Sequence, residues 1–202
     1  MAPNTKSARR AREIEHTRRD IVEAAARVFA KAGFHAATMQ AIAHQVGFTA
    51  ASLYTYFESK DEIFTALVED LAGAFRATFE APVPAGLTFE QRLELLLQRQ
   101  FEVAVARRQA LRILFDLGPS RRGRGAEGPV QYLMGLTRFL TDAGATERLR
   151  CTPDEAARVL FGITQATFLP WILGSDVEVA EPARHASHVV DLFLRGAGRP
   201  GA

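Results

Sequence analysis

The chain has 202 residues and a mass of 22.2 kDa, and 48% of its residues are hydrophobic, which suffices to bury a sizeable core in one or two domains. Its single cysteine, Cys151, excludes an internal disulfide and a zinc site made of cysteine pairs. We expect a cytoplasmic protein without signal peptide or membrane span, because no apolar segment follows the basic start and no uninterrupted apolar run approaches about 18 residues.

Positive charge is concentrated toward the start of the chain. The net charge is +2, but residues 1–60 hold nine basic and five acidic side chains, and acids slightly outnumber bases in the remainder. This distribution favours a polyanion as the partner of the N-terminal part. We expect residues 1–16 to be a disordered arm or a frayed extension of the first helix. The basic side chains of this arm either contact DNA or only aid solubility, and they are Lys6, Arg9, Arg10 and Arg12.

The first predicted helix begins at Thr17. Ile21, Ala25 and Phe29 recur at intervals of four residues, so they fall on one helical face. We expect Gly33 to end this helix, because glycine enters the left-handed conformation at little cost.

The segment TMQAIAHQVGFTAASLYTYFESK, residues 38–60, predicts two short helices joined by a tight turn. Thr38 and Thr49 are the expected N-caps, since a threonine oxygen accepts hydrogen bonds from the free N–H groups of a first turn. Gly47 between them ends the first of the two helices. This arrangement is a helix-turn-helix, whose second helix usually enters the major groove of DNA.

Small and hydroxyl-bearing side chains occupy the outer face of the second of these helices. Hydroxyl groups suit phosphate oxygens, alanines let the backbone approach base edges, and Thr55 suits a base edge or a thymine methyl group. Lys60 then supplies a point charge for phosphate. The alternative is a plain helical hairpin with solvated hydroxyls. The outer face comprises Thr49, Ala50, Ala51, Ser52, Thr55 and Tyr56.

The rest of the chain also reads as helical, which predicts an all-α protein of about nine helices. A capping box at Ser59–Glu62 opens a long helix. We expect a loop over residues 118–129, and Pro170 lies inside the penultimate helix. His185 and His188 share a face, but no carboxylate is placed to complete a metal site, so we expect neither metal nor cofactor. The helices predicted after the first three cover residues 60–79, 88–105, 111–117, 130–143, 153–173 and 181–194.

Residues 17–68 strongly resemble the N-terminal domain of the TetR family of transcriptional regulators. The matching marks are AAxxxFAxxGF ending at Phe34, then Thr38, IAxxVGF at 42–48, SLYxYF at 52–57 and SKDEIF at 59–64. They occur in the right order with the right gaps. The resemblance covers about the first third of the chain, and the remainder varies freely in this family, so it does not identify a ligand.

The resemblance implies a DNA-binding domain over residues 17–77, which includes the start of the connecting helix 60–79, and an effector-binding and dimerisation domain over 78–202. Ala50, Ala51 and Thr55 match base-proximal positions of the family. Position 50 is often basic in relatives, and here it is alanine, so specificity rests more on Thr55, methyl contacts and DNA shape. The positions that match backbone contacts are Thr38, Thr49, Ser52, Tyr54, Tyr56 and Lys60.

The resemblance further implies a homodimer, most often a repressor, that binds a palindromic operator in double-stranded DNA. The last two predicted helices are the expected dimer interface, and the alternative is that they are buried within one subunit. Candidate interface residues are Gly162, Ala166, Ala186 and Val190.

A small effector is expected to bind among the middle helices and to release the DNA. No charged residue stands out on their apolar faces, so we expect a largely apolar effector. The candidate pocket residues, any of which could instead be ordinary core, are Phe75, Phe79, Phe101, Phe115, Met134, Phe168 and Trp171.

Two other functions are weighed against this one. An effector-independent architectural DNA-binding protein would need little beyond the basic part, so the large C-terminal domain argues against it. A helical enzyme would need a nucleophile–base pair or paired acids, and none occurs at a telling spacing. We therefore do not expect an enzyme.

Overall fold

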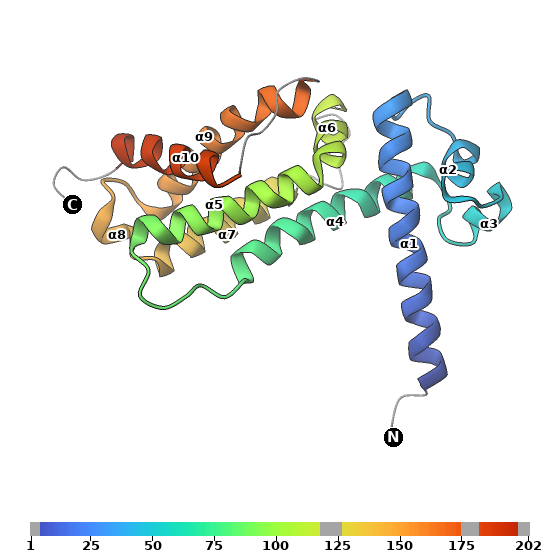
Figure 1. Cartoon of the computed structure of the whole chain (residues 1–202), viewed down its shortest axis with the longest axis horizontal. Helices are drawn as coiled ribbons and strands as arrows, with labels where there is room; N and C mark the ends of the chain where they lie inside the picture. The colour runs from blue at the N-terminus through green and yellow to red at the C-terminus, as the bar shows by residue number, and fades with distance from the viewer. Residues whose placement is uncertain (1–4, 118–126, 175–181, 198–202) are drawn as a thin grey trace. The chain divides into compact units, whose positions relative to one another are not determined.

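The computed structural model of the chain describes residues 5–117, 127–174 and 182–197, and these form ten α-helices without a strand (Figure 1). The predicted all-α class is confirmed. The predicted number of helices was one too low because α8 (Ala145–Arg148), which follows Gly144 in the left-handed conformation, is too short to show a helical period. Most of the loop expected over 118–129 lies outside the described residues.

The other helices have the following bounds: α1 Thr5–Ala32, α2 Met39–Val46, α3 Ala50–Tyr54, α4 Lys60–Glu80, α5 Phe89–Ala106, α6 Arg108–Asp116, α7 Glu127–Asp142, α9 Pro153–Leu173 and α10 Pro182–Ala197.

The chain divides into two compact units. One unit takes in Met1–Leu71 and Gln109–Gly125, and the other takes in Ala72–Arg108 and Ala126–Ala202. The single helix α4 contributes its first half to one unit and its second half to the other.

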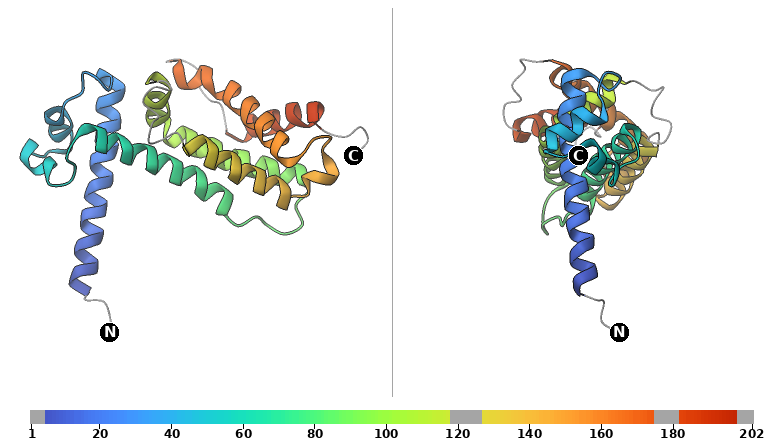
Figure 2. Two further views of the ribbon diagram at one scale, coloured as in Figure 1. Left: turned by 180° about the vertical axis from the view of Figure 1, so that it is seen from behind. Right: turned by 90° about the vertical axis from the view of Figure 1, so that its right-hand side faces the viewer.

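In the first unit, α1 packs against α2, and α2 packs against α3 (Figure 2). Ile21, Ile42 and Leu53, one from each helix, are all fully buried at the centre. Phe57 is also buried, and it lies beyond the end of α3, one turn after Leu53.

The first helix begins at Thr5, before the helical pattern that starts at Thr17, so the described part of the N-terminal arm extends this helix, which was one of the two expectations for it. Residues 7–16 are exposed on every side, so no apolar face in the sequence marks them as helical. Pairs one turn apart hold this part of α1 together, with Arg9 2.9 Å from Glu13 and His16 3.0 Å from Asp20.

In the second unit, α5 packs against α10, α7 against α9, and α9 against α10. Leu93, Leu160 and Phe193, from α5, α9 and α10, are fully buried between them. Capping boxes at Thr88 and Thr152 begin α5 and α9, where the sequence predicts helix starts.

Among the described residues, one helix, α9, is long enough and apolar enough to cross a membrane, judged by length and composition alone. Core helices of globular proteins meet the same test. Residues buried within the second unit, such as Leu160, Phe168 and Ile172, account for only part of its apolar length. An exposed apolar face on α9 remains.

Candidate nucleic-acid interface

Local hydrogen bonds cap the starts of α2 and α3. The Thr38 Oγ1 accepts from the Ala41 N–H at 3.1 Å, and the Thr49 Oγ1 accepts from the Ser52 N–H at 3.1 Å. Between them, Gly47 has a φ of 80°, which permits the tight turn that other residues would strain to make. The structure therefore contains the helix-turn-helix that the sequence predicts.

The predicted DNA-contacting residues lie on one stretch of chain with its polar side outward. Leu53 and Phe57 point into the core, while Tyr54 between them is 53% exposed. Of the residues predicted to contact DNA, the exposed ones are Thr38, Thr49, Ala51, Ser52, Tyr54 and Thr55, and the half-buried ones are Ala50, Tyr56 and Lys60.

The hydroxyl of Thr55 is already engaged at the end of α3. It donates to the Ser52 carbonyl at 2.7 Å, and the Ser52 hydroxyl in turn lies 2.9 Å from that of Thr49. With its proton committed, Thr55 offers a ligand only acceptor lone pairs and a methyl group. Those are the features that suit an amino group of a base or a thymine methyl.

Tyr56 is oriented by a neighbouring ring. It stacks on Phe48 with ring centroids 6.0 Å apart and an angle of 25° between the planes. Phe48 follows Gly47 directly, so the turn and the end of α3 are held together by this contact.

Lys60 has its ammonium group bound to the backbone. Its Nζ donates to the carbonyl oxygens of Phe34, His35 and Ala37 at 3.0, 3.0 and 3.1 Å. The ammonium also lies 4.9 Å from the centre of the Phe34 ring. A lysine has three N–H donors, so these bonds use all of them. Lys60 thereby fastens the α1–α2 connection to the start of α4.

Arg18 is a structural residue that no motif in the sequence indicates. Its guanidinium donates to the Tyr56 carbonyl and, at 3.2 Å, to Glu62, and it lies 3.9 Å from the centre of the Phe57 ring. Glu62 also accepts from the Glu58 N–H at 2.7 Å. Arg18 thus holds the segment after α3 against α1, yet nothing local in the sequence marks it, because its partners lie about 40 positions away.

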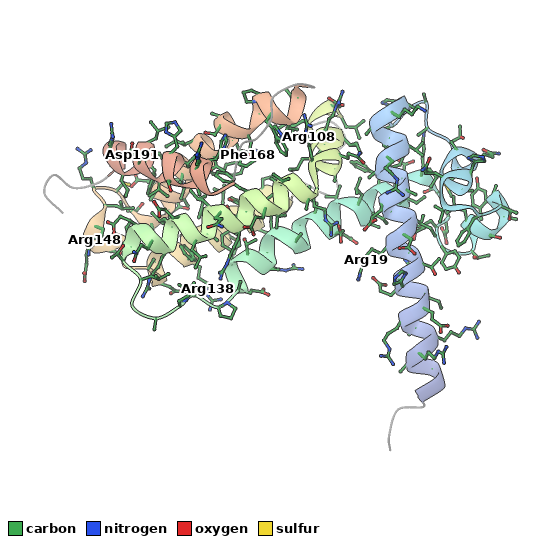
Figure 3. All side chains as sticks on the ribbon, in the orientation of Figure 1. Arg19, Arg108, Arg138, Arg148, Phe168 and Asp191 are labelled. Atoms are coloured by element: carbon green, nitrogen blue, oxygen red, sulfur yellow. The ribbon has the colours of Figure 1, made fainter. Side chains whose placement is uncertain are left out.

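Exposed cations on α1 supply positive charge in the same unit. Arg19, labelled in Figure 3, and Arg10 are exposed. Arg12 is exposed and spends one donor on a carbonyl of its own helix. These guanidinium groups have N–H donors left for phosphate groups, whereas the Lys60 ammonium donates all three of its N–H groups to carbonyl oxygens.

The four candidate interface residues divide into two pairs. Gly162 and Ala166 on α9 are exposed, whereas Ala186 and Val190 on α10 are buried within the subunit. The exposed pair belongs to a longer apolar row that follows alternating steps of three and four residues, a spacing that keeps it on one side of a helix. This row, the α9 stripe, comprises Val159, Gly162, Ala166, Leu169 and Leu173.

Three of the predicted pocket residues form a closed aromatic core in the second unit. Phe101 and Phe168 have ring centroids 4.3 Å apart, and Trp171 lies 5.7 Å from Phe168, which Figure 3 labels. All three are at least nine-tenths buried. Arg108 lies over the Trp171 ring and donates to its carbonyl at 2.8 Å, which closes the C-terminal end of α9.

The other predicted pocket residues lie elsewhere. Phe75 and Phe79 are half-buried near the end of α4 and meet Tyr132 of α7 edge-on, at 6.0 and 5.4 Å. Met134 is 66% exposed, and Phe115 belongs to the other unit. Of the predicted pocket residues, only Phe75 and Phe79 are therefore half-buried and also in contact with another half-buried aromatic ring.

The described residues contain no group of three or more His, Cys, Asp or Glu side chains that could hold a metal ion. His188 is exposed, and the buried Nδ1 of His185 has no hydrogen-bond partner among the residues that the structure describes.

A family model described as "Bacterial regulatory proteins, tetR family" matches residues 21–67, which span the end of α1, the helix-turn-helix and the start of α4. The chain is 32% identical over 190 residues to YdgC, an uncharacterised HTH-type transcriptional regulator of Bacillus subtilis (strain 168). That match covers 89% of this chain and 92% of YdgC.

Regulators of fatty acid metabolism are also similar. The fatty acid metabolism regulator protein of Bacillus subtilis (strain 168) is 25% identical over 159 residues, covering 76% of this chain and 82% of that protein. The crystal structure of the transcriptional regulator FadR from Bacillus subtilis in complex with stearoyl-CoA superposes with a TM-score of 0.73 at 23% identity, covering 88% and 97% of the two chains. FadR from Bacillus halodurans gives 0.75 at 20% identity, covering 88% and 94%.

Proposed function

Because the chain belongs to the TetR family of bacterial regulatory proteins, we infer that it is a helix-turn-helix transcriptional regulator and not an enzyme. We propose that it is a homodimeric repressor that binds a palindromic operator. A small and largely apolar effector would release it from the DNA. The observation that carries the proposal is the α2–Gly47–α3 unit, with two threonine N-caps and an exposed polar face over a buried Leu53. The protein would act in the cytoplasm.

The readout of DNA is proposed to divide between base edges and phosphates. Ala51 and Thr55 present small or methyl-bearing groups to the bases, with Ala50 beside them. Thr38, Thr49, Ser52, Tyr54 and Tyr56 bind the phosphate backbone through hydroxyl groups. Arg10 and Arg19 on α1 add salt-dependent affinity.

Dimerisation through the α9 stripe is supported by its exposure. Val159, Leu169 and Leu173 are 48%, 37% and 47% exposed, a row of apolar side chains that water does not favour. Gly162 and Ala166 between them let a second helix approach closely. A two-fold dimer presents two α3 helices, which is why we expect an operator with two-fold symmetry.

The effector is proposed to act by shifting a population between two states. An effector that prefers a dimer whose α3 helices no longer match the half-site spacing lowers operator affinity. A coupling of about 1–3 kcal/mol changes that affinity roughly 5–150-fold. A long-chain acyl thioester is the first compound to test, because FadR of Bacillus subtilis binds stearoyl-CoA.

The experiment is a titration of stearoyl-CoA into the purified protein bound to a duplex that the protein itself has selected from random DNA. We expect two chains per duplex and release as the ligand is added. Coenzyme A alone is the control, and it should release nothing. Binding of one chain per duplex would contradict the dimer, and release by coenzyme A would contradict an apolar effector.

A further inference from the structure

A chain of hydrogen bonds runs through the interior of the second unit. The Tyr132 hydroxyl donates to Gln100 Oε1 at 2.6 Å, and Gln100 Nε2 donates to Thr78 Oγ1 at 3.5 Å. The Thr78 hydroxyl donates onward to the Phe75 carbonyl at 2.6 Å. The chain therefore links α7, α5 and α4, and all of its bonds point in one direction.

This polar chain is buried but incompletely satisfied. Gln100 is 1% exposed and Thr78 is 6% exposed. A side-chain amide has two N–H donors, and among the described residues the only partner of Gln100 Nε2 is Thr78, at the long limit of a hydrogen bond. A buried N–H without a good partner costs free energy, and core packing alone favours an apolar residue there. Gln100 thus holds a donor that the protein itself does not use well.

Half-buried aromatic residues contact Tyr132, at one end of this chain of hydrogen bonds. Phe75 and Phe79 meet the Tyr132 ring from α4, and Phe161 of α9 meets it at 5.3 Å. The residues Phe75, Phe79, Tyr132 and Phe161 are half-buried, whereas Gln100 is buried. Gly135 on α7 permits this grouping, because a Cβ at that position would lie 2.9 Å from the Phe79 ring.

We propose that Gln100, oriented by the hydrogen bond from the Tyr132 hydroxyl, forms the polar floor of the effector site. Its amide would bind an uncharged hydrogen-bond acceptor, such as an ester or ketone carbonyl, on an apolar body packed against Phe75, Phe79 and Phe161. This inference rests on the proposed function, which assigns an effector to the second unit. The free N–H of Gln100 donates to the carbonyl oxygen of the ligand.

The floor favours a neutral group over a carboxylate. Gln100 and Thr78 carry no charge, and burial raises the pKa of Tyr132, so the phenol stays protonated at any pH near neutrality. A carboxylate bound there would lose its hydration without gaining a cation in exchange.

The same contact reaches the helix that continues toward the DNA-reading unit. Thr78 and Phe75 belong to α4, whose first residue, Lys60, fastens the α1–α2 connection. A ligand carbonyl that draws Gln100 Nε2 away from Thr78 removes the hydrogen bond between α5 and α4. Effector binding would thereby loosen the end of α4 directly.

The test uses straight-chain ligands that differ only in the polar end: methyl octanoate, methyl laurate and methyl stearate, the matching carboxylates, and alkanes of equal length. Binding to the full-length protein is measured by the shift in its thermal unfolding midpoint and by calorimetry. We expect the esters to bind about three- to tenfold more tightly than the alkanes, as one added hydrogen bond predicts, and the carboxylates more weakly than the esters.

The variant Gln100→Met should keep alkane binding and lose the preference for the ester. Tyr132→Phe should reduce that preference. Gln98→Met is the matched control, since Gln98 lies on the same helix and, within the described part of the chain, bonds only to the nearby Glu102, at 3.3 Å. A preference that survives in Gln100→Met, tighter binding of the carboxylates, or no binding by any of the compounds would overturn the proposal.

Binding of selected DNA by the same variants, without ligand, keeps the two proposals separate. If Gln100→Met binds DNA as tightly as the unaltered protein but shows no change in ligand preference, the site assignment fails and the proposed function stands. If the unaltered protein selects no DNA sequence, the proposed function fails, whatever the ligands do.

Discussion

Lys60 has backbone partners that its position in the sequence does not suggest. The sequence predicts a phosphate contact, and in the structure the three N–H donors are bound to carbonyls of residues 34–37. We predict that Lys60→Met lowers the free energy of unfolding by about 1–3 kcal/mol, as expected for lost hydrogen bonds to a charged group. It should lower DNA affinity through the displaced turn, and leave the slope of log K against log salt unchanged.

The measurement is a salt titration of DNA binding by Lys60→Met. Lys31→Met, which removes an exposed lysine from α1, controls for the loss of one charge. A Lys60→Met slope that is smaller by about 0.9 would identify Lys60 as a phosphate contact after all.

Thr55 is the residue on which base preference should depend most. We predict that Thr55→Ala relaxes the preferred sequence more than it lowers affinity for non-specific DNA, because the acceptor and methyl group at the end of α3 are lost. Thr65→Ala is the matched control, since the Thr65 hydroxyl donates to a carbonyl of its own helix at 3.0 Å, outside the proposed reading face. Recovery of the same motif by the Thr55→Ala and unaltered proteins would exclude Thr55 from base readout.

Whether the role of a residue can be predicted depends on how far along the chain its bonding partners lie. The caps at Thr38 and Thr49 bond to residues three positions on, so local sequence is enough to find them. Arg18 and Lys60 bond across 23 to 44 positions, and Gln100 reaches Tyr132 across 32. No local pattern encodes such pairs, because only the fold brings them together.

At the scale of elements, we expect the stability of the start of α9 to depend on pH. The pKa of Glu155 is lowered, first by its hydrogen bond from the Thr152 N–H and then by the Thr152 hydroxyl. A carboxyl whose folded pKa lies below its unfolded value stabilises the fold above the unfolded pKa, and that contribution is lost as the pH falls through the folded pKa. Acid should therefore weaken the start of α9 below about pH 4.5.

We predict that Glu155→Gln is less stable than the unaltered protein near neutral pH and that the difference narrows below pH 4.5. Denaturant unfolding at a series of pH values measures this. A constant difference at all pH values would show that the charge of Glu155 does not contribute through the capping box.

Elements were predictable where they bury an apolar face or carry a cap. The starts of α5 and α9 follow their capping boxes, and α2 ends at Gly47 as expected. For the first turns of α1 the sequence left a disordered arm and an extension of the helix both open, because these turns bury nothing. The helix α8 was missed because four residues cannot display a period. A helix is recognisable in the sequence when it buries an apolar face, because apolar residues then recur at helical spacing. Helices that bury no such face show no such pattern.

At the scale of the whole molecule, the proposed dimer depends on the α9 stripe. Ala166→Glu places a charge in the middle of that stripe, where a partner helix would bury it without a counter-ion. We predict that the variant is a folded monomer, because position 166 is exposed in a single subunit, and that its DNA affinity falls at least tenfold. Sedimentation velocity and DNA titration measure the two effects.

The matched control is Val130→Glu, which changes another exposed apolar residue, on α7, to the same charge. It should remain a dimer. A dimer that persists in Ala166→Glu would place the interface elsewhere. The sequence could suggest the last two helices as an interface, but it could not separate exposed Ala166 from buried Ala186, since that requires the packing of α9 against α10.

Selection of bound sites from random duplex DNA by the purified full-length protein tests the central claim most directly. We predict an inverted repeat whose half-sites are centred about 34 Å apart, one helical turn, or more, as two α3 helices related by two-fold symmetry require. No recovered motif, together with binding that collapses as salt rises, would contradict a sequence-specific dimeric regulator and would favour an architectural DNA-binding protein.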